Sequence, residues 1–96
     1  MLGIVATLKV KPGMEQDFEA LATQLVSKVR AHEPGCTLYV LHRAETPGTY
    51  VFMERYVDDA AFEVHRKTEH MRTLGRKMGD YMEGRAELMR LREVGA

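Results

Sequence analysis

The fold is decided by Gly35-Cys36-Thr37-Leu38-Tyr39-Val40-Leu41-His42, followed by Tyr50-Val51-Phe52-Met53-Glu54-Arg55-Tyr56 and then by Asp58-Asp59-Ala60-Ala61-Phe62-Glu63-Val64-His65. The first two segments alternate in the period of two that is typical of strands, whereas the third has helical spacing. The sequence therefore predicts two strands followed directly by a helix. A carboxylate, several aromatic rings and the two histidines His65 and His70 are expected near this junction.

The residues before this stretch predict one strand and one long helix. Apolar residues alternate from Leu2 to Val10, and Lys11-Pro12-Gly13 ends that pattern. From Met14 the apolar residues fall at helical spacing, and Glu33-Pro34-Gly35 ends the helix. The first part of the chain is therefore expected to form a strand and an amphipathic helix.

The remaining elements complete the pattern. The strands near Cys36–Ala44 and Thr49–Val57 are separated by Glu45-Thr46-Pro47-Gly48, a short link that favours an antiparallel hairpin. Asp58 or Asp59 can cap the helix that follows. A further helical stretch is expected around His70–Met82, interrupted by Gly75 and Gly79, and a fourth strand from about residue 86 to residue 93.

The resulting order, β-α-β-β-α-β, is that of the α+β ferredoxin-like fold, with helices on one face of a four-stranded antiparallel sheet. We expect a single domain over residues 1–96. The third strand has Tyr50, Phe52 and Tyr56 on one side but Val51, Met53 and Val57 on the other. Because a solvated face should be polar, this two-sided pattern predicts a homodimer packed sheet to sheet.

Composition excludes several classes of partner. The 14 basic and 14 acidic side chains cancel, so nothing in the net charge favours nucleic acid. No apolar run approaches the roughly 20 residues that a membrane span needs, and the first residues lack the pattern of a secretory leader, so we expect a cytoplasmic protein. The single Cys36 is expected to be a packed side chain, with no disulfide and no zinc.

At this point the chain resembles the antibiotic biosynthesis monooxygenase domain family, whose members are small dimeric α+β barrel proteins. The resemblance rests on Lys9-Val10-Lys11-Pro12-Gly13, on Glu33-Pro34-Gly35-Cys36, and on Tyr50–Tyr56 followed by Asp58-Asp59-Ala60-Ala61, His65 and His70. The family commonly shows Glu-x-Trp-x-Asp with His-x-x-x-x-His about ten residues later. This chain has Tyr56 at the tryptophan position.

The resemblance implies an oxygenase that uses neither a metal nor an organic cofactor, in which oxygen reacts directly with a quinol, a polyphenol or a related small aromatic substrate. Some relatives instead bind and degrade haem, with the help of a Trp and an Asn. This chain contains neither residue type, which disfavours haem degradation.

His65 and Glu54 are the candidate catalytic pair. Such a reaction needs a base that deprotonates the phenol, and a neutral histidine oriented by a carboxylate suits that role. Glu54 shares its strand face with aromatic residues, where an unpaired carboxylate would be costly. Structural alternatives stay open, because Glu54 could cap a helix or pair with an arginine and His65 could be a satisfied core histidine.

The candidate substrate-binding residues combine aromatic bodies with polar groups: Tyr39, Tyr50, Phe52, His70 and Tyr81. Core packing is the alternative for each tyrosine. His70 lies five residues after His65, about 140° further around an ideal helix, so no metal site is expected from this pair.

These observations predict a homodimeric oxygenase with a pocket between sheet and helices. Two alternatives remain: a small-molecule-binding or stress-response module without catalysis, and an isomerase of a small hydroxyketone that uses His65 and Glu54 without oxygen.

Overall fold

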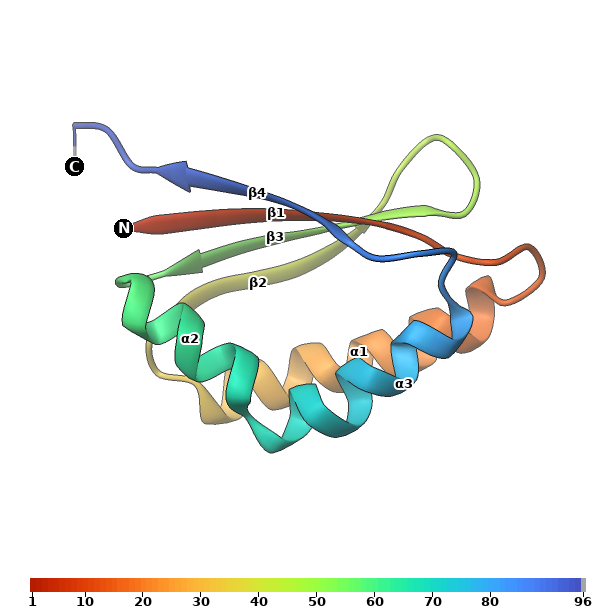
Figure 1. The fold of residues 1–96 in the computed structure, drawn as a ribbon, viewed down its shortest axis with the longest axis horizontal. Coiled ribbons are helices and arrows are strands. Elements are labelled where there is room, and N and C mark those ends of the chain that lie inside the picture. Colours follow the sequence, from red (N-terminus) through yellow and green to blue (C-terminus); the bar gives the residue numbers. More distant parts are fainter. Residues whose placement is uncertain (96) are drawn as a thin grey trace.

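The computed structural model describes residues 1–95, which form one sheet with helices on one of its sides (Figure 1). In chain order the elements are β1 (Leu2–Lys9), α1 (Glu15–His32), β2 (Cys36–Arg43), β3 (Thr49–Tyr56), α2 (Asp59–Lys67), η1 (Met71–Gly75), α3 (Arg76–Met78), η2 (Gly79–Tyr81) and β4 (Glu87–Arg92). η1 is a π-helix and η2 a 3-10 turn. Within the described residues, none of the helices has both the length and the hydropathy that crossing a membrane requires.

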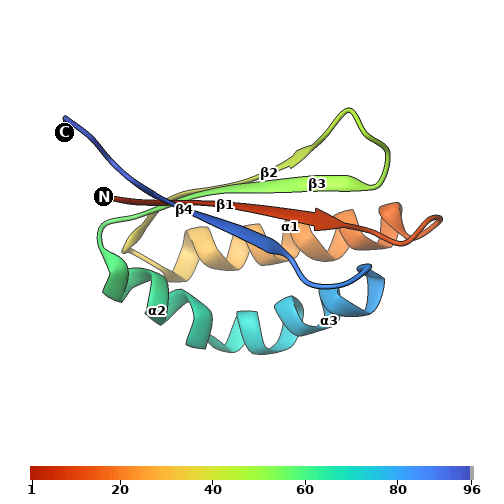
Figure 2. The ribbon, with the colours of Figure 1, turned by 45° about the horizontal axis from the view of Figure 1, so that its top comes forward.

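The four strands lie in the order β2-β3-β1-β4, and each neighbouring pair is antiparallel. Figure 2 shows α1 running beneath the sheet beside the layer formed by α2 and α3. The predicted α+β fold with a four-stranded antiparallel sheet is therefore confirmed.

The core lies between the sheet and the helices. Because successive strand residues point to opposite faces, every second side chain of β1 and β3 is directed inward. The buried inward set comprises Leu2, Ile4, Ala6 and Leu8 from β1 and Tyr50, Phe52, Glu54 and Tyr56 from β3. From α1, the buried residues are Phe18, Leu21, Ala22, Leu25 and Val29. One carboxylate, Glu54, is thus enclosed among aromatic and aliphatic groups.

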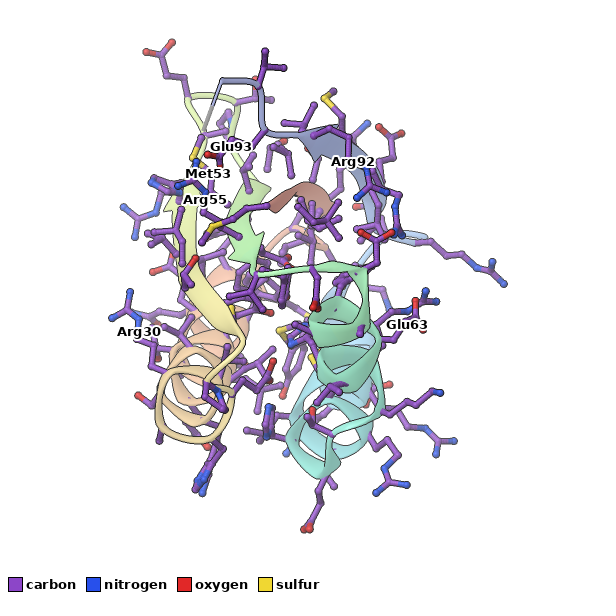
Figure 3. The ribbon with its side chains drawn as sticks, turned by 90° about the vertical axis from the view of Figure 1, so that its left-hand side faces the viewer. Arg30, Met53, Arg55, Glu63, Arg92 and Glu93 are labelled. Carbon is purple, nitrogen blue, oxygen red and sulfur yellow. The ribbon has the colours of Figure 1, made fainter. Side chains whose placement is uncertain are left out.

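The outer face of the sheet has an apolar row that crosses all four strands. Val5 is paired with Met53 and with Met89, and Met53 is paired with Val40. The exposed fractions of Met53 and Met89 are 45% and 58%. Figure 3 shows Met53 on the side of the sheet opposite the helices. The sheet therefore has the two-sided apolar character expected from its sequence.

The connection from α1 to β2 approaches α2 closely at Gly35. A Cβ atom at Gly35 would lie 2.7 Å from the Cβ of Ala61, closer than side chains normally pack. Glycine is thus required here by proximity, because its φ angle is not in the left-handed region. The close approach brings the neighbouring Glu33 against the buried side of α2.

The chain changes direction at Thr68, immediately after α2. Asp58 caps the start of α2 by accepting a 2.8 Å hydrogen bond from the backbone N–H of Ala61. Thr68 is extended (φ −66°, ψ 155°) and ends the helix. The helical stretch predicted from His70 to Met82 is present in short pieces that change type near Gly75 and Gly79. The sequence predicts a second helical stretch from about His70 but not the exact end of the first, and the break at Thr68 determines where His70 lies.

Candidate active site

A cavity of about 230 Å³ lies between the inner face of the sheet and the helices. Its lining is mostly apolar and comprises Ala6, Leu8, Tyr39, Phe52, Glu54, Phe62, His65, Arg66, Met71, Met78, Ala86 and Leu88. Arg66 and Leu88 are exposed, so they mark the side on which the cavity meets solvent. Besides the phenol of Tyr39, the ionisable groups in the interior part of the lining are His65 and Glu54, the predicted catalytic pair.

His65 projects from α2 into this cavity and is 3% exposed. It follows Phe62 by three residues, so both side chains lie on the inward face of the helix. Its ring centroid lies 5.2 Å from that of Tyr39 and 5.5 Å from that of Tyr56. Burial lowers the pKa of His65, although the nearby carboxylate of Glu33 acts in the opposite direction. The imidazole is therefore neutral and able to accept a proton at pH 7.

The carboxylate that orients His65 is Glu33, and the prediction from the sequence that Glu54 has this role is wrong. Nδ1 of His65 lies 2.9 Å from Oε1 and 3.0 Å from Oε2 of Glu33. Glu33 is 5% exposed and stands at the C-terminal cap of α1. The sequence indicates Glu33 only as part of a helix stop, because the separation of 32 positions between it and His65 hides their contact. The signal that could have found it is Glu33-Pro34-Gly35-Cys36, one of the segments that carries the family resemblance.

His70 contacts the same carboxylate. Its Nε2 lies 2.5 Å from Oε2 of Glu33. A helical wheel separates the two histidines, but it does not apply here because α2 ends at Lys67 and Thr68 is extended. The structure therefore brings His65 and His70 to one buried carboxylate, but His70 is not among the residues that line the cavity.

Glu54 lines the cavity but forms no hydrogen bond with His65. Its carboxylate accepts a 2.6 Å hydrogen bond from the hydroxyl of Tyr56, and only 7% of the residue is exposed. Burial raises the pKa of Glu54 to about 7, with a smaller upward contribution from the charge of Glu33 and an opposing one from the Tyr56 hydrogen bond. At neutral pH this carboxyl is thus poised between its two protonation states, as a general base or acid should be.

Two of the predicted substrate-binding residues line the cavity. The rings of Tyr39 and Phe52 form one wall, with centroids 5.0 Å apart. Burial raises the pKa of Tyr39, so its hydroxyl stays protonated and can donate a hydrogen bond.

The other predicted aromatic contacts lie elsewhere. Tyr50 packs on Phe18, and its hydroxyl donates to Glu19, which also binds Arg43. Tyr81 packs against the core from η2 but is outside the cavity lining. For these two residues the structure supports core packing, the alternative that was left open from the sequence.

Among residues 1–95, Glu33, His65 and His70 form the one group whose atoms could together ligate a metal ion, since these atoms lie within 4.8 Å of one another. Ligand atoms placed tetrahedrally around a zinc ion would be about 3.3 Å apart. In the structure the carboxylate oxygens lie 2.5 to 3.0 Å from the two imidazoles. The arrangement is thus that of a hydrogen-bonded triad.

Comparison with known proteins identifies the family. The family model described as "Antibiotic biosynthesis monooxygenase" matches residues 1–77. A Bacillus subtilis (strain 168) protein named "Putative monooxygenase YcnE" is 31% identical over 70 residues, which cover 73% of this chain and 74% of that protein.

Solved structures agree with this match. The crystal structure of a Caulobacter crescentus CB15 protein, described as a "putative antibiotic biosynthesis monooxygenase", is similar with a TM-score of 0.92 and 38% identity, covering 97% of this chain and 89% of that one. A crystal structure of an antibiotic biosynthesis monooxygenase has a TM-score of 0.91 and 30% identity, covering 98% of this chain and 99% of that chain. The chain therefore belongs to the antibiotic biosynthesis monooxygenase family.

Proposed function

We propose that this protein is a cofactor-independent monooxygenase that oxidises a small hydroquinone or polyphenol with molecular oxygen. The observation that carries the proposal is one aromatic-walled cavity in which two buried groups, His65 and Glu54, can accept protons at neutral pH. Membership in a family of monooxygenases supplies the reaction class.

The volume of the cavity limits the substrate. An apolar cavity of roughly 150 Å³ holds a benzene molecule. The 230 Å³ available here suits one or two small rings and is too small for a porphyrin. Tyr39 and Phe52 provide a flat apolar wall against which a planar ring can pack. Size and lining thus favour a small phenol over haem.

The reaction needs proton transfer from the protein and electrons from the substrate. Neutral His65 takes the proton of a substrate hydroxyl, and the resulting anion gives up electrons to oxygen far more readily than the phenol does. One oxygen atom enters the ring and the other leaves as water, so a hydroquinone plus O₂ gives a hydroxyquinone plus H₂O. Glu54, with its pKa of about 7, can take the proton of a second hydroxyl or return one to the reduced oxygen.

Oxygen uptake with a panel of benzohydroquinones and naphthohydroquinones tests this function. Incorporation of one ¹⁸O atom from labelled O₂ separates monooxygenation from simple oxidation to hydrogen peroxide. We expect His65→Ala to lower the rate by about 10² to 10⁴-fold, the usual range for loss of a general base. His42→Gln is the matched control, because His42 is exposed on β2 and lies outside the cavity.

The two alternatives predict different results in the same assay. A hydroxyketone isomerase would turn over its substrate without oxygen and would still depend on His65 and Glu54. A binding module would bind a hydroquinone without turnover. Either result would replace the proposed oxygenase.

We further propose that the protein is a homodimer in which the outer faces of two sheets pack together. The support is the apolar row of Val40, Met53, Val5 and Met89, which would otherwise remain in water. Exposed apolar surface of this kind marks an interaction site or an aggregation hazard. A second copy presents the same row and is therefore complementary to it.

A further inference from the structure

Three buried side chains connect the cavity with a separate groove on the surface. The groove, of about 430 Å³, lies between α1 and the η1 segment and is lined by Gln24, Lys28, His32, Glu69, His70, Thr73 and Leu74. His65 lines the cavity, His70 lines the groove, and Glu33 is hydrogen-bonded to both. The cluster thus has one imidazole facing each space and a carboxylate between them.

The hydrogen bonds determine which ring nitrogens remain available. An ionised carboxylate can only accept hydrogen bonds, so Nδ1 of His65 and Nε2 of His70 both donate to Glu33. This leaves Nε2 of His65 and Nδ1 of His70, which make no hydrogen bond to the described part of the chain. Each histidine can therefore exchange a proton through the nitrogen that Glu33 does not hold.

One carboxylate can neutralise only one imidazolium. One ring nitrogen of His65 lies within 4.8 Å of one ring nitrogen of His70, and two cations this close in a buried site repel strongly. A cluster in which one of the two histidines is an imidazolium has no net charge, because the carboxylate of Glu33 balances it. A cluster in which both histidines are imidazolium ions is a buried cation. The two histidines should therefore titrate as a coupled pair.

We propose that Glu33, His65 and His70 form a proton-exchange device in which His65 accepts a proton from the cavity as His70 releases one to the groove. The device requires that the extra proton of the resting cluster be on His70. When a substrate hydroxyl in the cavity loses its proton, the O–H bond breaks and an N–H bond forms at Nε2 of His65. The N–H bond at Nδ1 of His70 breaks, and water in the groove takes that proton.

The substrate in this inference comes from the proposed function. The coupling between the charges of His65 and His70 does not depend on that function. His70 exchanges a proton with water in the groove but acts on the substrate only through Glu33 and His65, so it is a positioning residue. Burial lowers the pKa of His65, the hydrogen bond and the charge of Glu33 raise it, and the charge of His70 lowers it. The other titratable groups around the cluster are Lys28 and His32 of α1, Cys36 and Tyr39 of β2, Glu54 and Tyr56 of β3, Arg66 of α2, and Glu69.

The coupling can be tested without turnover by ¹⁵N NMR of the histidine rings between pH 5 and pH 9. In the wild-type protein we expect a proton on one histidine to disfavour a proton on the other, so that the two rings do not titrate independently. In His70→Gln, the amide nitrogen can still donate to Glu33 but cannot hold an extra proton. His65 then no longer experiences repulsion from a protonated His70, and the midpoint of its titration should rise by roughly one pH unit. His32→Gln is the control, because His32 lines the same groove without binding Glu33.

Turnover provides the second readout. With a hydroquinone that the wild-type protein oxidises, His70→Gln should lower kcat at least tenfold, leave KM within twofold, and be partly rescued by added imidazole. If the wild-type protein oxidises no hydroquinone, the proposed function fails and the NMR titration alone decides the coupling. Independent titration of the two histidines, or an unchanged His65 midpoint in His70→Gln, would overturn the proposal. Loss of activity on chelation, restored by zinc, would also overturn it in favour of a metal centre.

Discussion

Replacement of Gly35 by alanine should destabilise the protein through a clash that a second substitution can relieve. The new Cβ would lie 2.7 Å from the Cβ of Ala61, whereas ordinary contacts begin at 3.4 Å, so α2 or the loop must move by most of an ångström. Overpacking of this kind costs about 1 to 3 kcal/mol. Since 1 kcal/mol shifts Tm by about 4 to 8 °C in a domain of this size, the loss should be easily measured.

The assay is urea denaturation at a fixed protein concentration, because association would add to the apparent stability. Gly79→Ala is the matched control, since no atom lies within 4 Å of the Cβ that it would add. Ala61→Gly alone should cost about 1 kcal/mol in helix propensity. Combined with Gly35→Ala, it should remove the clash. The double variant should then lose less unfolding free energy than the two single variants together, by about 1 kcal/mol or more.

The contact between Gly35 and Ala61 also affects the candidate site. If the loop moves away from α2, Glu33 moves away from His65, so Gly35→Ala should alter the ring ¹⁵N shifts of His65 and the double variant should restore them. A Gly35→Ala protein as stable as Gly79→Ala, or a double variant with purely additive losses, would refute the proposed role of Gly35.

Three further predictions concern charge and assembly. Folding raises the pKa of Glu54 from 4.5 to about 7, so the folded state binds the proton of this carboxyl more tightly than the unfolded state does. The free energy of unfolding should therefore fall by about 3 kcal/mol in total as the pH rises between these two values. Glu54→Gln should lack this loss in urea titrations from pH 5 to pH 8, and an unchanged pH dependence would contradict the assignment. Tyr56→Phe removes the hydroxyl that stabilises ionised Glu54, so ¹³C NMR should show the pKa of Glu54 rising above 7; a lower pKa would be inconsistent with the geometry. Met53→Lys should separate the proposed dimer in sedimentation experiments whereas Val64→Lys, at an exposed position on α2, should not; a monomeric wild-type protein would exclude the dimer.

The elements of the fold were predictable because their signals are local. Alternation within β1 and β3, helical spacing in α1, and the breaks at Pro12-Gly13 and Pro34-Gly35 each depend on neighbouring residues. The inward direction of Glu54 also followed from strand parity alone. Local pattern was therefore sufficient for the sheet and for the residues on each of its faces.

The partner of His65 could not be predicted in the same way. Glu54 and Glu33 are both carboxylates near predicted strand or helix ends, and the choice between them depends on how closely the α1–β2 loop approaches α2. That distance depends on the missing side chain of Gly35 and the small side chain of Ala61. Sequence spacing does not record such a contact between distant segments, so it favours Glu54, which is nearer to His65 in the chain, over Glu33, which is nearer in space.

The position of His70 follows from a residue that ends a helix without being glycine or proline. A spacing of five would direct His65 and His70 to different sides of a continuous helix. Thr68 prevents this, because its hydroxyl donates to the carbonyl of His65 and accepts from the backbone N–H of Met71, which satisfies groups at the end of α2 and the start of η1. The chain can then turn between the histidines without leaving those polar groups unpaired. A His-x-x-Thr-x-His segment is for this reason compatible with two imidazoles on one carboxylate, which a helical wheel drawn through it would exclude.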